Sequence, residues 1–107
     1  MDNQNNWESM VIEFNEPLKE NITVPVRFQA LKDLAIKEIK TSCGCLGALY
    51  NKSTRILEAT FKTGSVPIHL STQGYYITHK NIIITYEDGS SQVLSFSAKI
   101  AKDGVSI

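Results

Sequence analysis

The sequence predicts an all-β protein in which about seven short strands form an antiparallel sandwich. Apolar and polar residues alternate along several segments, which is the period of a half-buried strand, whereas helical spacing is hard to find. Glycine, proline, asparagine and aspartate separate these segments, as they do in turns. With 107 residues, the chain is long enough for one domain that builds a core without a disulfide or a metal.

The first expected strand is MVIEF at residues 10–14, and residues 16–21 are expected to turn, with Asn21 favouring a bend. Residues 22–30 (ITVPVRFQA) alternate apolar and polar side chains and predict a second strand. Pro25 places a residue without an N–H group inside this strand. We therefore expect the strand at an edge of a sheet, or bulged at the proline.

Residues 34–42 predict a third strand, although their composition would tolerate a helix. The apolar spacing slips by one residue between Ile36 and Ile39, which indicates a bulge or a short helical turn. Residues 43–54 (CGCLGALYNKST) are predicted as a loop, or as a short strand with a turn at each end. Residues 55–63 (RILEATFKT) alternate again and predict an amphipathic strand.

The C-terminal part of the chain predicts a β-hairpin. Residues 80–86 (KNIIITY) are rich in β-branched residues, and residues 92–100 (QVLSFSAKI) alternate. Asp88-Gly89 lies between these two segments and is typical of a tight hairpin turn. Residues 64–76 contain glycine and proline and are predicted as a long connection with, at most, one short strand.

These elements predict one domain, an immunoglobulin-like β-sandwich over residues 10–101, with a small barrel as the alternative. Residues 1–9 would form an N-terminal arm and residues 102–107 a polar C-terminal tail. No internal repeat, low-complexity segment or linker divides the chain.

Charge and composition limit the classes of partner. Lys plus Arg number 11 and Asp plus Glu number 11, so the formal net charge is zero. General binding to nucleic acid or to an anionic membrane needs a basic field, so we expect neither partner. The N-terminus, MDNQNNWESM, lacks the pattern of a signal peptide, and no apolar run has the length of a transmembrane helix. These observations predict a cytoplasmic protein, or one that leaves the cell within an assembly such as a virion.

The segment IKEIKTSCGCLG (residues 36–47) resembles a motif of a bacterial and phage family of domains of unknown function, which belongs to the Hydin-related immunoglobulin-like sandwiches. The family strand usually reads L-x-I-x-x-V-x-T-S-C-G-C-T. The matching positions are Leu34, Ile36, Ile39, Thr41, Ser42, Cys43, Gly44 and Cys45. The similarity covers residues 11–100, but Leu46 replaces the usual threonine and residues 29–35 replace an N-x-G-x-x-P-L step.

This resemblance implies an immunoglobulin-like fold and a role as a binding module, and it implies no enzymatic activity. Family members often carry a secretion or lipoprotein signal, which is not seen in this sequence. A version without that signal is similar to the phage-encoded members, which would fit a component of a virion.

The two cysteines, Cys43 and Cys45, are one residue apart. A disulfide within C-x-C closes a very small ring and would be strained and easily reduced. Dithiol catalysts more often use C-x-x-C at the start of a helix, and no helix is expected after Cys45. We therefore interpret the two thiols as reduced side chains on one face of a strand end, where they fill the core. A labile redox pair and a metal site are the alternatives.

A metal site would need further ligands. The two histidines, His69 and His79, could complete a Cys2His2 set with the two cysteines. Zinc sites usually present a tighter pair of histidines, so we predict no metal and no cofactor. The sequence also shows no recognisable nucleophile with its base, no paired carboxylates and no phosphate-binding loop, so we predict no enzymatic activity.

Aromatic residues supply the candidate contacts for a partner. Trp7 lies in the polar N-terminal arm, where it either folds back on the domain or anchors the arm to a neighbouring subunit. Tyr75 and Tyr76 are equally compatible with an interface and with packing on the core. Because adjacent residues of a strand face opposite ways, we expect one of these two tyrosines to point outward.

The predicted function is therefore a non-catalytic structural or protein-interaction module. Its partners would be other proteins in an oligomeric or virion assembly, for example as a decoration, head or tail accessory protein. The surfaces expected to bind are an exposed edge strand, the connection at residues 64–76 and the N-terminal arm. The alternative is a thiol redox or metal-binding protein that uses Cys43 and Cys45.

Overall fold

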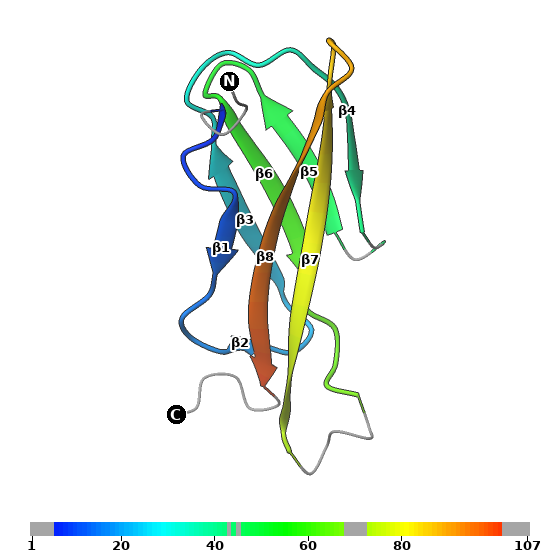
Figure 1. Cartoon of the computed structure of the whole chain (residues 1–107). Coiled ribbons are helices and arrows are strands. Elements are labelled where there is room, and N and C mark those ends of the chain that lie inside the picture. Colours follow the sequence, from blue (N-terminus) through cyan, green and yellow to red (C-terminus); the bar gives the residue numbers. More distant parts are fainter. Residues whose placement is uncertain (1–5, 43, 45, 68–72, 102–107) are drawn as a thin grey trace.

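The computed structural model describes residues 6–42, 44, 46–67 and 73–101. It confirms the all-β prediction, because the described residues form strands and no α-helix, and hence no helix that could span a membrane. The strands pack as two sheets, one behind the other in Figure 1. They are β1 Val11–Glu13, β2 Leu18–Lys19, β3 Thr23–Gln29, β4 Ile36–Thr41, β5 Leu46–Asn51, β6 Ile56–Lys62, β7 Tyr75–Tyr86 and β8 Ser91–Ala101.

The larger sheet has the order β1-β8-β7-β4, with β2 also paired to β8. Its centre is the predicted hairpin, in which β7 and β8 pair antiparallel from Tyr75 and Ala101 to Thr85 and Ser91. The turn follows the expected Asp88-Gly89 chemistry: Gly89 has a φ of 93°, which favours glycine, and the Asp88 carboxylate accepts the Ser90 N–H at 2.8 Å.

The smaller sheet and the β4–β7 and β7–β8 pairs are antiparallel, as predicted, whereas β1 and β2 both run parallel to β8. Alternation identifies the buried face of a strand, but it carries no information about the direction of the neighbouring strand. β8 is the last strand of the chain, so no tight hairpin constrains its pairing with the N-terminal segment. β2 also raises the strand number above the expected seven, in a segment predicted as a turn.

The smaller sheet is antiparallel and has the order β3-β6-β5. β3 is an edge strand, as Pro25 predicted. β4, in the other sheet, has a register shift between Ile36 and Glu38, which confirms the predicted bulge. Residues 46–51 form the strand β5, which is the second of the two alternatives that the sequence left open.

The core lies between the two sheets and is built from the alternating faces that the sequence predicts. Phe61 of β6 and Phe96 of β8 connect the sheets through an edge-to-face contact, with ring centroids 5.2 Å apart. The other buried strand residues with exposures of 3% or less are Val26, Phe28, Leu57, Ala59, Ile82, Ile84, Leu94, Ala98 and Ile100.

Trp7 belongs to this core, since only 2% of its surface is exposed. Its indole Nε1–H donates a hydrogen bond of 2.9 Å to the Tyr86 hydroxyl, and its ring packs edge-to-face on Tyr50 at 6.2 Å. The backbone of Trp7 also bridges to Ala30. Of the two alternatives for Trp7, the structure shows the one in which it folds back on the domain. Because almost none of its side chain is accessible, Trp7 is not a contact for a neighbouring subunit, as the other alternative had it.

Candidate interaction surface

The S-C-G-C segment joins the two sheets, although Cys43 and Cys45 themselves lie outside the described residues. β4 ends at Thr41 in the larger sheet, and β5 begins at Leu46 in the smaller one. Ser42 extends the β4–β7 pairing by one residue: its N–H donates to the Asn81 carbonyl at 3.0 Å, and its hydroxyl accepts the Asn81 N–H at 3.1 Å. Ser42 and Gly44 are both exposed, so the polar part of the motif lies at the surface.

The suggested Cys2His2 set cannot be placed from the described residues. His69 lies outside them, and His79 is exposed on β7. Within the described part of the chain, no three side chains of histidine, cysteine, aspartate or glutamate gather as metal ligands would. The absence of a metal therefore stays a prediction.

Tyr75 and Tyr76 face opposite sides of β7, as the alternation predicts. Tyr76 packs against the core, and its hydroxyl donates a hydrogen bond of 3.0 Å to the Thr63 carbonyl. Burial raises the pKa of Tyr76, and the nearby Glu20 carboxylate raises this pKa further. Tyr75 lies on the other face, where the Lys99 ammonium sits 4.4 Å from the centre of its ring. Of the pair, only Tyr75 lies on the outer face of the sheet.

The structure adds a surface that none of the candidate residues marked, along the strand β5. Among the described residues, β5 pairs with β6 on one side only, so its other side is an open edge. Leu49, in the middle of β5, is 76% exposed, which is the highest exposure among the large apolar side chains of the described part. An uncovered strand edge presents unpaired N–H and C=O groups to any extended segment that approaches it.

A cleft of about 380 Å³ runs along this open edge, between β5 and the edge strand β4 of the other sheet. The two strands lie on the same side of the sandwich in Figure 1. Ile36 and Ile39 of β4 and Tyr50 of β5 provide apolar walls, and charged side chains surround them. Burial raises the pKa of Tyr50, and this pKa is lowered in part by a hydrogen bond with the backbone of Leu34.

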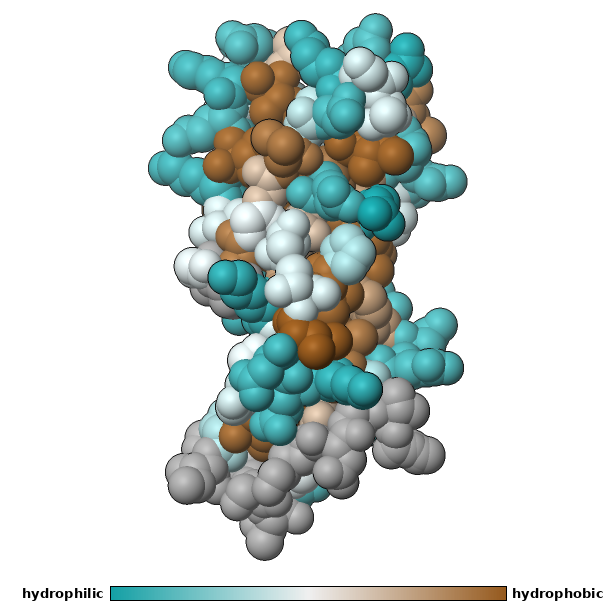
Figure 2. Space-filling model, turned by 180° about the vertical axis from the view of Figure 1, so that it is seen from behind, coloured by the Kyte–Doolittle hydropathy of each residue, from teal (hydrophilic) through white to brown (hydrophobic). Residues whose placement is uncertain are grey.

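The outer face of the smaller sheet borders the same edge. Figure 2 views the molecule from this side, where apolar residues are exposed among hydrophilic ones. Next to Leu49, the Arg27 guanidinium and the Glu58 carboxylate form an ion pair of 2.7 Å across β3 and β6. Because the two charges compensate each other, Leu49 lies beside a locally neutral surface.

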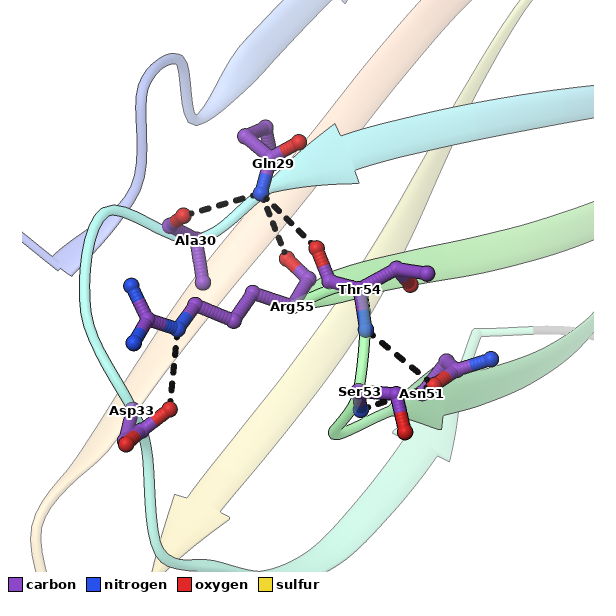
Figure 3. Close-up of polar contacts among 7 residues, drawn as sticks. All are labelled: Gln29, Ala30, Asp33, Asn51, Ser53, Thr54 and Arg55. Carbon is purple, nitrogen blue, oxygen red and sulfur yellow. Dashed lines mark hydrogen bonds and ion pairs between the residues drawn. The ribbon is translucent and has the colours of Figure 1, made fainter.

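The turn that follows β5 is held by a polar network, which Figure 3 shows. The Gln29 side-chain N–H groups donate to the carbonyls of Ala30, Thr54 and Arg55 at 3.0–3.2 Å. The Asn51 side chain accepts the N–H groups of Ser53 and Thr54 at 2.9 and 3.3 Å.

Arg55 closes the turn in a left-handed conformation, with φ of 60°, which is uncommon for an arginine. Its Nε–H contacts the Asp33 carboxylate at 2.8 Å, and its N–H donates to the Asn51 carbonyl at 2.7 Å. These contacts compensate for the local strain. Hydrogen bonds therefore link the C-terminal end of β5 to β3 and to the segment that contains Asp33.

Comparison of the chain with protein-family models, curated proteins and solved structures finds no match. The resemblance of the S-C-G-C segment to a family consequently stays a prediction. The β5 edge could not be recognised from the sequence alone, because residues 43–54 were compatible with both a loop and a short strand. The available signal was the composition of LGALYN: six residues without charge or proline.

Proposed function

We propose that this chain is a non-catalytic protein-interaction module that binds other proteins through the open edge of β5. The observation that carries the proposal is Leu49, 76% exposed on a strand edge that no described residue pairs with, beside a cleft with apolar walls. Strand addition to such an edge gives affinity through main-chain hydrogen bonds and specificity through side-chain pockets. The hydrogen-bonded turn at residues 51–55 supports this role, since a preformed edge loses little entropy on binding.

We further propose that the module works inside a larger assembly, such as a phage particle, and that it otherwise resides in the cytoplasm. The formal net charge of zero supports association with proteins rather than with nucleic acid. The virion itself is suggested by the family resemblance of the S-C-G-C segment. Mass spectrometry of purified particles and of cell fractions tests both locations: absence of the chain from particles contradicts the virion, and its recovery outside the cytosolic fraction contradicts the cytoplasmic location.

Lysine footprinting of the assembly tests the binding surface. Lys37 and Lys52 line the cleft between β4 and β5, whereas Lys99 lies on the outer face of β8, and all three are exposed. In the assembly isolated from its native source, we expect a lysine-reactive reagent to label Lys37 and Lys52 several-fold less than in the free chain. Lys99 serves as the control and keeps its reactivity. Equal labelling of all three lysines in the free and assembled states contradicts the proposal.

A cysteine double variant separates this function from thiol chemistry. Replacing Cys43 and Cys45 by serine should leave assembly binding intact, apart from a small loss of stability. If the variant has an unchanged melting temperature but no longer binds, the thiols are functional and the redox or metal-binding alternative replaces our proposal.

A further inference from the structure

We infer that the partner of the β5 edge is a second copy of this chain. In this arrangement the two β5 strands pair antiparallel about a two-fold axis at Leu49 and join the two smaller sheets into one. The inference rests on the proposed function and names the partner for the same edge. A two-fold interface uses the same patch on both copies, so β5 must be complementary to itself.

The other sheet edges carry features that discourage strand addition. β3 has Pro25 in its middle, and β1 and β2 have only 3 and 2 residues. β4 has a register shift and three charged residues, Lys37, Glu38 and Lys40. β5 pairs with β6 in unbroken register over its whole length and has no such feature. Proteins rarely leave one edge open while blocking the others, unless something covers it.

Gly47 gives a second, independent indication. A glycine inside a strand is destabilising and often marks a place where another backbone approaches. Gly47 has no positive φ, and a Cβ atom built on it would meet no heavy atom within 4 Å. Nothing in the described part of the chain therefore requires a glycine at this exposed position, and a neighbour from outside the chain would explain it.

The register about Leu49 matches small residues with large ones. Leu49 faces Leu49 of the second copy, which buries the most exposed large apolar side chain of the described part. On the same outer face, Gly47 lies opposite Asn51 of the second copy. On the inner face, Ala48 lies opposite Tyr50. Directly opposed residues of antiparallel strands have their side chains on the same face, so each of these pairs can pack.

Charges next to the edge do not oppose this pairing. Glu38 and Lys40 of β4 form an ion pair of 3.9 Å within the chain. Their side chains lie on the outer face of the larger sheet, because Ile39 between them packs on the core. The formal net charge of zero adds no long-range repulsion between two copies.

The expected dimer is weak. Pairing six residues per copy buries less surface than a standard interface of roughly 1,600 Å². We therefore expect a dissociation constant on the order of 10–100 µM. Sedimentation velocity from about 5 µM to about 1 mM covers this range. A wild-type chain that stays monomeric throughout overturns the inference.

Opposite charges at position 49 test the register. Leu49→Lys and Leu49→Glu each place like charges face to face on the axis, so each variant should dimerise at least about tenfold more weakly. Their melting temperatures should match wild type, because Leu49 is exposed. Equimolar mixing of the two variants should restore dimers, since lysine then faces glutamate. Failure of mixing to restore dimers, or unchanged dimers of the single variants, overturns the pairing at Leu49.

Two further variants complete the experiment. Ile77→Lys is the matched control, because Ile77 is an exposed apolar residue (59%) on β7, away from the β5 edge, and this variant should dimerise like wild type. Gly47→Val should raise the melting temperature and yet weaken the dimer, since valine favours strands but crowds Asn51 of the second copy. Equal loss of dimer in Ile77→Lys, or unaltered dimers in Gly47→Val, counts against the proposed interface.

The outcome is distinguishable from failure of the proposed function. A monomeric wild type with Lys37 and Lys52 still protected in the native assembly overturns the second copy as partner and leaves the β5 edge as the binding surface. If the wild-type chain dimerises but the lysines of the cleft are not protected in the assembly, the second copy remains the partner and the β5 edge is overturned as the surface that binds other proteins.

Discussion

The two ends of the sandwich differ in how their aromatic residues are buried. At the end where the β7–β8 turn lies, Trp7 is inserted into the core and donates to Tyr86, whose hydroxyl in turn donates to the Gln92 side chain. At the other end, Tyr76 packs inward on Thr63 while its neighbour Tyr75 points outward toward Lys99. The first end is closed by the aromatic side chain of Trp7. The second end is closed by the buried Thr63 and by Tyr76.

The difference shows that an aromatic residue in a polar segment says little about an interface. Trp7 comes from a hydrophilic stretch, yet a contact 79 residues away along the chain buries it. Tyr75 and Tyr76 are adjacent on a regular strand, where successive side chains point to opposite faces of the sheet, so one of them must point outward. The four predictions that follow test how strongly each end depends on these residues, from the largest expected effect to the smallest.

Trp7→Ala should have the largest effect, a loss of about 3–5 kcal/mol in the free energy of unfolding, because it empties a buried site between the sheets. Trp7→Phe keeps an aromatic ring but loses the hydrogen bond to Tyr86, and should lose about 1–2 kcal/mol. Urea denaturation measures both. A loss below about 1 kcal/mol for the alanine variant would contradict the closed end.

Thr63→Val tests the opposite end. The Thr63 hydroxyl is buried, donates to the Lys19 carbonyl at 2.7 Å and accepts the Ile22 N–H at 3.1 Å. Valine has a similar shape but leaves both backbone groups without this partner, so stability should fall by about 1–3 kcal/mol. Thr60→Val, on the exposed face of β6, the strand that ends just before Thr63, is the control and should change stability by less than about 0.5 kcal/mol. Equal effects of the two variants would exclude a special role for the hydroxyl.

Tyr76→Phe and Tyr75→Phe compare the two neighbours directly. The first should lose about 1 kcal/mol with its hydrogen bond to Thr63, and the second close to nothing. The pKa of Tyr76 is higher in the folded state than its ordinary value of 10.0. The stability that Tyr76 contributes is therefore fully present below pH 10.0 and is lost as the pH rises through the pKa of the folded state. Thermal melting at increasing pH should show this loss in wild type, and a smaller loss in Tyr76→Phe. Identical alkaline profiles would contradict the burial of the Tyr76 hydroxyl.

Asp88 at the hairpin turn should give the smallest effect. Hydrogen bonds from the Ser90 side chain and N–H lower the pKa of Asp88 below its ordinary value of 3.8. The stability that Asp88 contributes is therefore present above this value and is lost as pH falls through the lower, folded value. The melting temperature of Asp88→Ala should lie slightly below wild type at neutral pH, and the two should converge in acid. A difference that persists at the acid end would point to a cause other than the carboxylate.

Much of the fold could be predicted from local patterns. The apolar faces of β3, β6 and β8, the Asp88-Gly89 hairpin, the edge position of Pro25 and the bulge after Ile36 all follow from residue spacing and backbone chemistry. These features depend on the residues themselves and on the two-residue period of a strand. The candidate site was harder to predict from the sequence. A strand edge is open only if no other strand pairs with it, and this depends on the whole fold.

By itself, therefore, the sequence determined the buried faces of β3, β6 and β8 and the position of the Asp88-Gly89 turn, because burial and turn chemistry act over a few residues. Only the tertiary structure decided the parallel pairing of β1 and β2 with β8, the closure of one end by Trp7, and the edge of β5 that pairs with nothing in the described part of the chain. These properties depend on whether segments far apart in the sequence contact or pair with each other. The topology of the whole chain decides these contacts, and the local alternation of apolar and polar residues contains no information about it.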